Sequence, residues 1–176
     1  MSYPPHGLTP AALGLDPSIL NVDKAVDRAV AFARREAGWH IFPEVTETLT
    51  LDGEGGSVLT LPSLHVTELL AVTENGSALD EAAYEWSATG DLKRRGHCWT
   101  TRWRGVSVNL THGYDLEDAD LADLLGAIAG AVGVQAANPL GIPEVIGPYQ
   151  LTGDMSRAWI GDGRTTLSRF CLPWSA

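Results

Sequence analysis

The spacing of apolar residues changes twice along this 176-residue chain, and this change constrains the fold more than any other feature. Between residues 22 and 37 the apolar side chains recur every three or four positions, which is the repeat of an amphipathic helix. From 45 to 114 they alternate with polar residues, as in strands with one buried face. The helical repeat returns between 119 and 137. The sequence therefore predicts an α+β fold in which a small helical bundle with two long amphipathic helices encloses an antiparallel β insertion.

Residues at the ends of the two helical segments support these boundaries. Asn21 is the predicted N-cap of the first helix, and Gly38 ends it because glycine adopts the left-handed conformation without a steric penalty. Asp118 is the predicted N-cap of the second helix, where the helix dipole favours negative charge. We therefore expect helices over about residues 22–37 and about residues 119–137.

The remaining segments define the expected domain organisation. Residues 1–20 are rich in proline and glycine and are predicted to form an irregular N-terminal lead-in. Residues 21–153 form the predicted main domain, with its β region at about 45–114. Residues 154–176 are interrupted by glycine and are predicted to form an extended C-terminal arm.

Composition and charge exclude several classes of protein. The chain has 12 Lys and Arg against 22 Asp and Glu, a net charge of −10, so it is not expected to coat nucleic acid. A hydrophobic content of 44% is enough for a core. We expect no secretory signal and no membrane segment, because the most apolar stretch, residues 124–134, is too short to cross a bilayer. Two cysteines are too few for a disulfide scaffold, which favours a reducing compartment.

The residues that resemble an active site most closely are Cys98, His97 or His112, and an acid near Asp115. A cysteine nucleophile needs a base within hydrogen-bond reach and a group that orients the base, but no known nucleophile signature surrounds Cys98. The cysteine and histidine spacings of metal sites are also missing. We therefore expect no catalytic residues, no cofactor and no metal.

Basic and aromatic residues gather between positions 93 and 104. Arginine and tryptophan are enriched at protein interfaces, so this cluster is a candidate contact surface for an acidic partner, protein or nucleic acid. Another acidic protein surface is favoured, including a neighbouring copy of the chain. The alternative is a solvated loop whose positive charges neutralise an acidic body. The residues concerned are Lys93, Arg94, Arg95, Trp99, Arg102, Trp103 and Arg104.

Two further sets of residues suggest contacts with partners. Apolar side chains near the C-terminus either fold back on the domain or dock on another protein, since they are costly to leave in water. Three glycines in the second helix are spaced so that they allow close packing within or between subunits. The first set is Trp159, Phe170, Leu172 and Trp174, and the second is Gly126, Gly130 and Gly133.

Short motifs in a fixed order resemble head-to-tail adaptor, or connector, proteins of tailed phages of actinobacteria. The resemblance covers about residues 22–153. It is carried by AGWH at 37–40, TETLTLDG at 46–53, LPSL at 61–64, VTE at 66–68, YEWS at 84–87, THGY at 111–114 and IGPY at 146–149.

The resemblance implies a structural virion protein. About a dozen copies of such proteins form a ring in the phage neck, which joins the capsid portal to the tail and extends the DNA channel. The implied partners are other copies of the chain, the portal protein and the next neck or tail protein, and DNA passes without specific binding. An acidic ring fits this role, because it lets DNA slide. The implied location is the virion neck, with the host cytoplasm during assembly.

Three other functions stay open at this point. The same surfaces suit another neck or tail-completion protein, such as a stopper. A small cysteine hydrolase would use Cys98 and His112. A β-rich ligand-binding module would have a concave aromatic pocket.

Overall fold

The computed structural model describes residues 3–137, 144–146, 149–151, 159 and 162–173. Contacts divide the chain into two compact units. We call residues 3–39 together with 116–176 the helical unit, and residues 40–115 the β unit. The expected mixture of helices and antiparallel sheets is confirmed.

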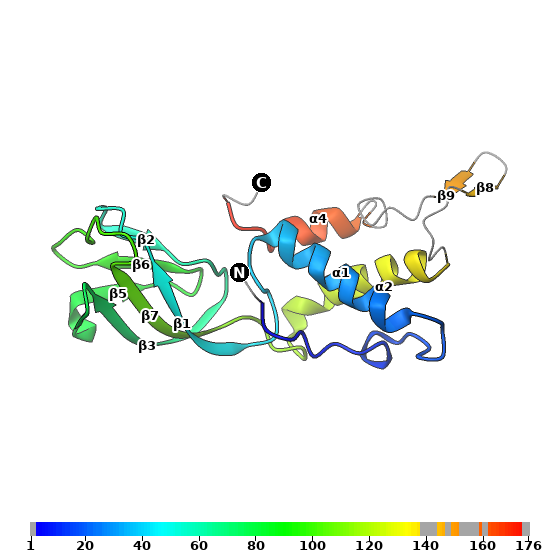
Figure 1. The fold of residues 1–176 in the computed structure, drawn as a ribbon, viewed down its shortest axis with the longest axis horizontal. Coiled ribbons are helices and arrows are strands. Elements are labelled where there is room, and N and C mark those ends of the chain that lie inside the picture. The colour runs from blue at the N-terminus through cyan, green and yellow to red at the C-terminus, as the bar shows by residue number, and fades with distance from the viewer. Residues whose placement is uncertain (1–2, 138–143, 147–148, 152–158, 160–161, 174–176) are drawn as a thin grey trace. The chain divides into compact units, whose positions relative to one another are not determined.

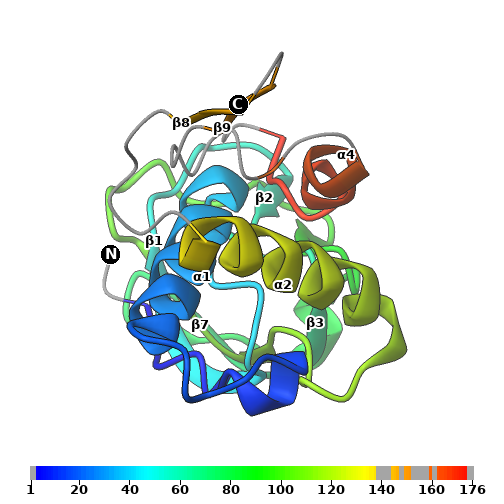
Figure 2. The same cartoon turned by 90° about the vertical axis from the view of Figure 1, so that its right-hand side faces the viewer.

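Three helices of the helical unit, α1, α2 and α4, pack against one another (Figure 2). Two short strands, β8 and β9, pair antiparallel in the same unit. The elements are η1 (Ala11–Leu13), α1 (Val22–Ala37), η3 (Ala119–Leu121), α2 (Ala122–Ala137), β8 (Glu144–Ile146), β9 (Tyr149–Leu151) and α4 (Asp162–Ser168).

The apolar stripes that predicted the helices form the interior of the helical unit. In α1, Val26 and Val30 are fully buried, and in α2, Leu124, Ile128 and Val132 are fully buried. The burial of each stripe against the neighbouring helices contributes most of the stability of such short helices.

The predicted ends of the helices are confirmed in part. Gly38 has φ +82° and donates its backbone N–H to Arg34 O, so it ends α1 as expected. Asn21 is not a side-chain cap: its φ is +64° and its side chain makes no capping hydrogen bond. Asp118 caps the short 3₁₀ turn η3, where its carboxylate accepts from Asp120 N at 2.9 Å, and α2 starts after this turn.

The described part of the C-terminal segment differs from the expected extended arm. It contains the helix α4 and returns to the helical unit, where Trp39 Nε1 donates to Phe170 O at 2.7 Å. Leu172 N donates to Ala37 O at 2.9 Å, and the ring of Trp159 stacks on Phe32. These apolar side chains gain more from burial here than they would gain as an exposed arm.

One stretch of the described residues, Ala119–Ala136, is long and apolar enough to cross a membrane. This stretch is longer than the apolar run at residues 124–134 on which the expectation of no membrane segment was based. Length and composition are weak evidence for a membrane span, because the core helix of a soluble protein meets the same criteria. Only 28% of this stretch is buried, so part of the helix surface is both apolar and exposed.

The β unit contains two antiparallel sheets (Figure 1). The first has the strand order β1-β7-β3-β4 and the second has the order β2-β6-β5. The elements are β1 (Val45–Leu51), β2 (Val58–Thr60), β3 (Val66–Glu74), β4 (Ser77–Ala78), η2 (Glu81–Ala83), β5 (Tyr84–Trp86), β6 (Asp91–Arg94) and β7 (Val106–His112).

The two sheets share one hydrophobic core. Strand β7 is central to it, because Val106, Val108 and Leu110 alternate with polar residues and are fully buried. Leu59 of β2 and Leu92 of β6 cover them from the second sheet. Strand β1 pairs with β7 from Val45 opposite His112 to Leu51 opposite Val106, so His112 marks one end of the sheet.

Candidate functional site

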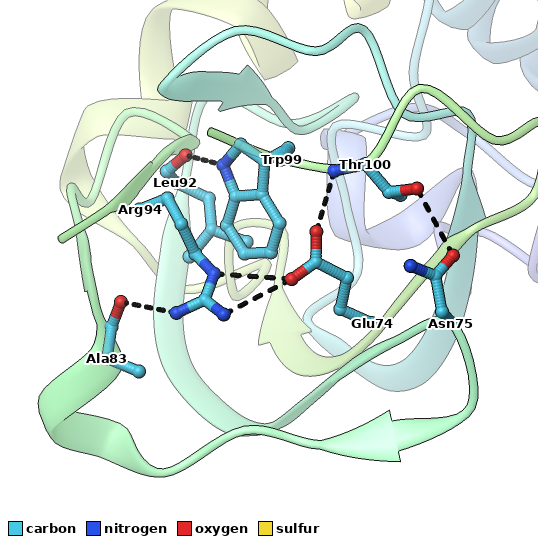
Figure 3. Close-up of polar contacts among 7 residues, drawn as sticks. All are labelled: Glu74, Asn75, Ala83, Leu92, Arg94, Trp99 and Thr100. Carbon is cyan, nitrogen blue, oxygen red and sulfur yellow. Dashed lines mark hydrogen bonds and ion pairs between the residues drawn. The ribbon is translucent and has the colours of Figure 1, made fainter. Parts of the chain in front are cut away.

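The loop between β6 and β7, residues 95–105, carries most of the basic and aromatic cluster. We call it the Trp103 loop. Glu74, at the end of β3, anchors it at two points (Figure 3). One carboxylate oxygen of Glu74 lies 3.2 Å from the guanidinium of Arg94, and the other accepts from Thr100 N at 2.6 Å. The ion pair is largely buried, which weakens screening by solvent.

Two predicted contact residues belong to this anchor instead of the surface. Trp99 is 2% exposed, and its Nε1 donates to Leu92 O at 3.1 Å. The guanidinium of Arg94 lies 5.5 Å from the centre of the Trp99 ring and also donates to Ala83 O (Figure 3). Burial of the indole and pairing of the guanidinium explain both residues as parts of the β unit. The interface prediction is corrected for Arg94 and Trp99.

A second set of contacts fixes the far side of the loop. Gly53 N donates to Arg102 O at 2.9 Å, and Arg104 N donates to the carboxylate of Asp52 at 2.6 Å. Residue 53 must be glycine, because a Cβ there would collide with the backbone of Thr100. The tip of the Trp103 loop is therefore held from both sides.

The tip itself is exposed. Trp103 is 86% exposed, and Arg102 and Arg104 on either side of it are exposed as well. Lys93 and Arg95 are also on the surface, and Arg95 forms an exposed ion pair with Glu85 at 2.9 Å. The structure thus presents a large apolar ring between two cations on an anchored loop. Such a preorganised Trp and Arg surface is typical of protein interfaces.

The β unit also has an open pocket of about 400 Å³ between β3 and β5. Its lining is acidic and aromatic, with one arginine. Burial and the nearby carboxylates of Glu81 and Asp80 raise the pKa of the Tyr84 hydroxyl, so Tyr84 stays neutral. The lining residues are Leu69, Glu81, Tyr84, Glu85, Trp86 and Arg95.

The pair that the alternative function, a small cysteine hydrolase, would use is Cys98 and His112, and it is not assembled. Cys98 is exposed and precedes Trp99, whose backbone N–H donates to Gly56 O beyond the end of β1. His112 lies at the other end of β7, and a seven-residue strand spans roughly 20 Å. The base would therefore be out of hydrogen-bond reach of the thiol.

His112 instead belongs to a cluster that the sequence did not indicate. His112 and His40 are 2% and 3% exposed, and their ring centres lie 4.5 Å apart. His112 Nε2 lies 3.0 Å from Glu47 Oε1. Burial lowers the pKa of His112, although its hydrogen bond to Glu47 and the charge of Glu47 oppose this effect. A sequence signal existed for His112, which takes a buried position in the apolar alternation of β7, whereas Glu47 of β1 is exposed.

The other predicted contact residues have different positions. Trp159, Phe170 and Leu172 are buried within the helical unit, so they are not available to a partner in this conformation. Trp174 lies outside the described residues.

Gly126, Gly130 and Gly133 are exposed on α2. A Cβ at each of them would meet nothing within 4 Å, so the close packing expected of these glycines does not occur among the described residues. Close packing between subunits stays a prediction.

Comparison with known proteins identifies the fold. No protein-family model and no curated protein matches the sequence. Among solved structures, one similar chain comes from the neck of a native gene transfer agent (GTA) particle computed with C12 symmetry. The two share 15% identity with a TM-score of 0.57, over 90% of this chain and 91% of that one.

Two further structures give the same result. A chain from the neck of an empty GTA particle, computed with C6 symmetry, has 14% identity and a TM-score of 0.53, over 97% of this chain and 92% of that one. A chain from the virion of a native GTA particle has 14% identity and a TM-score of 0.55, over 100% and 97%. The protein therefore shares its fold with chains of GTA particles along nearly the whole length of both partners.

Proposed function

We propose that this chain is a structural protein of the neck of a tailed phage or a GTA-like particle. The observation that carries the proposal is the fold likeness, which extends over at least nine-tenths of both chains in each comparison. A likeness of this extent includes both the helical unit and the β unit. It agrees with the sequence resemblance to head-to-tail adaptors, which rests on separate residues and motifs.

In the finer form of the proposal, copies of the chain form a closed ring that joins the portal to the tail and extends the DNA channel. The similar neck structures were computed with C12 and C6 symmetry, which supports a ring. The net charge of −10 supports a wall along which DNA slides without being held. No bond-making step is assigned to the chain, and its partners are other copies, the portal protein and the next neck or tail protein.

We assign a docking role to the tip of the Trp103 loop. A ring uses head-to-tail contacts, so each subunit needs two different, complementary surfaces. The tip contacts the segment that follows β1, and β1 is an outer strand of the first sheet. The pocket borders β5, which is an outer strand of the second sheet, so the two surfaces lie at different edges of the β unit. The tip supplies two cations and an indole. The pocket supplies Glu81, aromatic walls and the Glu85–Arg95 ion pair. The pocket of a neighbouring copy is therefore the proposed receptor of the tip.

If the tip has a docking role, a substitution there should impair assembly of the particle without lowering the stability of the chain. Trp103→Ala should leave the free energy of unfolding within about 0.5 kcal/mol of the wild type, because the side chain is already in water. The same variant should fail to enter particles in a complementation assay. Trp99→Ala is the contrasting variant, since removal of a buried indole costs about 3–5 kcal/mol.

The complementation assay tests the docking role alone, and the position of the chain in the particle separates the proposed function from the other neck functions. Incorporation of Trp103→Ala at the wild-type level would contradict the docking role but not the neck location. A chain found in the neck outside the portal-proximal ring would be a stopper or tail-completion protein.

A further inference from the structure

We propose that the free edge of β1 binds the β8–β9 hairpin of a neighbouring copy, which adds a strand to the first sheet. The inference rests on the proposed ring and names a second contact between its subunits. Strand β1 belongs to the β unit and the hairpin to the helical unit. The two surfaces are therefore different from each other, as a head-to-tail contact requires.

The outer edge of β1 is open. This strand is the first in the order β1-β7-β3-β4, and its seven residues all pair with β7 on one side. Among the described residues no strand pairs with β1 on the other side. Alternate residues of an edge strand direct their backbone N–H and C=O groups away from the sheet, so these groups are available to a further strand. Thr46, Thr48 and Thr50 are exposed, which leaves the strand accessible.

Strand β1 also lacks the features that protect an edge from pairing. Its register with β7 is continuous, whereas the register of β3 with β7 shifts twice. It contains neither proline nor lysine. The other outer strands, β2, β4 and β5, have only two or three residues. Strand β1 is therefore the edge of the β unit that is best suited to accept another strand.

The β8–β9 hairpin has no third strand in its own chain. Glu144 pairs with Leu151 and Ile146 with Tyr149, and no further strand of the described chain joins this sheet. The two strands pack mainly on each other, whereas α4 of the same unit packs on α1 and α2. A two-stranded hairpin is at best marginally stable in water. Addition to a third strand would therefore stabilise it.

The sequences of the two surfaces suit each other. Main-chain hydrogen bonds provide the affinity when a strand is added to a sheet edge, and facing side chains refine the fit. The β-branched threonines of β1 form favourable cross-strand pairs with aromatic and β-branched residues. Like charges opposite each other are unfavourable, and β1 carries Glu47 while β8 carries Glu144. The uncharged strand β9, with the sequence Tyr149–Gln150–Leu151, is therefore the strand that contacts β1.

The edge of β1 continues into the contact surface already proposed for the ring. Soon after β1 ends, Gly53 N donates to Arg102 O at the tip of the Trp103 loop. The free strand edge and the tip are thus neighbours within the β unit. One adjoining copy could engage both, and the backbone pairing would fix the register of the two subunits.

The test is disulfide cross-linking of the chain in assembled particles. A cysteine on β9, Tyr149→Cys or Gln150→Cys, is combined with one on β1, and both positions of β9 are used because successive residues lie on opposite faces of a strand. We expect at least one combination to give covalent dimers and higher multimers on oxidation. Cross-links within single chains only, or none in any combination, would overturn the proposal. The positions on β1 are Thr46→Cys, Thr48→Cys and Thr50→Cys.

Matched controls identify the edge that is used. The background carries Cys98→Ser and Cys171→Ser, so that no native thiol contributes. Ser77→Cys on β4, the other outer strand of the first sheet, should not cross-link to Gln150→Cys. Each single-cysteine variant should stay monomeric under denaturing conditions. Multimers of a single-cysteine variant would mean that identical strands pair with each other and would also overturn the proposal.

A pair of substitutions tests the role of the backbone. Gln150→Pro removes a backbone donor from β9 and should lower incorporation into particles about tenfold, whereas Gln150→Ala keeps the donor and should stay within about twofold of the wild type. Equal incorporation of the two variants would overturn the proposal. A neck ring that forms without any cross-link would refute this contact alone, whereas absence of the chain from the neck would contradict the proposed function itself.

Discussion

Glu74 holds the Trp103 loop against the β unit through its side-chain carboxylate. The carboxylate binds both the Arg94 guanidinium and the Thr100 backbone N–H, so the loop is fixed to strands β3 and β6. A loop fixed before binding loses little conformational entropy on docking. The same exposed tryptophan on an unanchored loop would bind more weakly.

Replacement of Glu74 should therefore affect stability strongly. Glu74→Ala leaves the largely buried Arg94 without its carboxylate partner and should lower the free energy of unfolding by about 1.5–3 kcal/mol. Glu85→Ala is the matched control, because it breaks the exposed ion pair with Arg95 and should cost under about 1 kcal/mol. Urea unfolding of both variants checks the difference, and equal losses would refute the anchoring role.

His112 should make stability depend on pH. Burial lowers its pKa below the ordinary value of 6.5, so the unfolded chain binds a proton more readily than the folded one. The contribution of neutral His112 is therefore complete above about pH 6.5 and is lost as the pH falls towards the pKa of the folded state.

Urea unfolding in the presence of a chelator, at a series of pH values from neutral to mildly acidic, measures this effect. The free energy of unfolding should fall more steeply with acidification in the wild type than in His112→Gln. His97→Gln, in the exposed Trp103 loop, should retain the wild-type profile. Parallel profiles for wild type and His112→Gln would contradict the effect.

At the scale of elements, the exposed face of α2 is the least explained part of the helical unit. Gly126, Gly130 and Gly133 interrupt the helix, and nothing within the described chain occupies the space beside them. Glycine lowers helix stability by about 1 kcal/mol relative to alanine. The chain therefore retains three costly residues on a surface that a neighbouring subunit could approach closely.

Gly130→Ala tests whether the glycine face has this role. The substitution should raise the free energy of unfolding by about 0.5–1 kcal/mol, because the added methyl group has room and the helix is stabilised. If subunits pack closely on this face, the more stable variant should assemble less efficiently in the complementation assay. Gain of stability with normal assembly would mean that the glycines have no role between subunits.

The sequence predicted those elements whose apolar residues repeat regularly. Two patterns were sufficient to predict an element: the apolar stripe of α1, which includes Val26 and Val30, and the alternation of β7. Burial of the apolar residues determines both elements. The helix α4 was missed because its seven residues include Gly163 and carry no repeat of their own, so it depends on packing against α1 and α2.

The candidate sites were less predictable because they also depend on contacts between residues far apart in the chain. Trp99 and Trp103 are indistinguishable in sequence. Only the fold separates the buried ring of Trp99, whose Nε1 donates to Leu92 O, from the exposed ring of Trp103. The cluster of His40, Glu47 and His112 depends on the pairing of strands far apart in the chain. His112 in the otherwise apolar alternation of β7 was its only local signal.

At the scale of the whole molecule, charge is distributed unevenly between the acidic chain and the basic tip of the Trp103 loop. The chain carries −10 overall, while Arg102 and Arg104 concentrate positive charge beside the exposed Trp103. In a ring, this contrast would direct neighbours towards one another and leave the remaining surface acidic towards DNA. Such a division agrees with a protein whose role is assembly.

The most direct test of the proposed neck function is a cryo-electron microscopy reconstruction of the neck of particles that contain this chain. We predict a closed ring of about twelve copies between the portal and the tail, with the Trp103 loop of each copy against its neighbour. A neck without the chain, with the chain found only on tail fibres or in the unassembled fraction, would contradict the account.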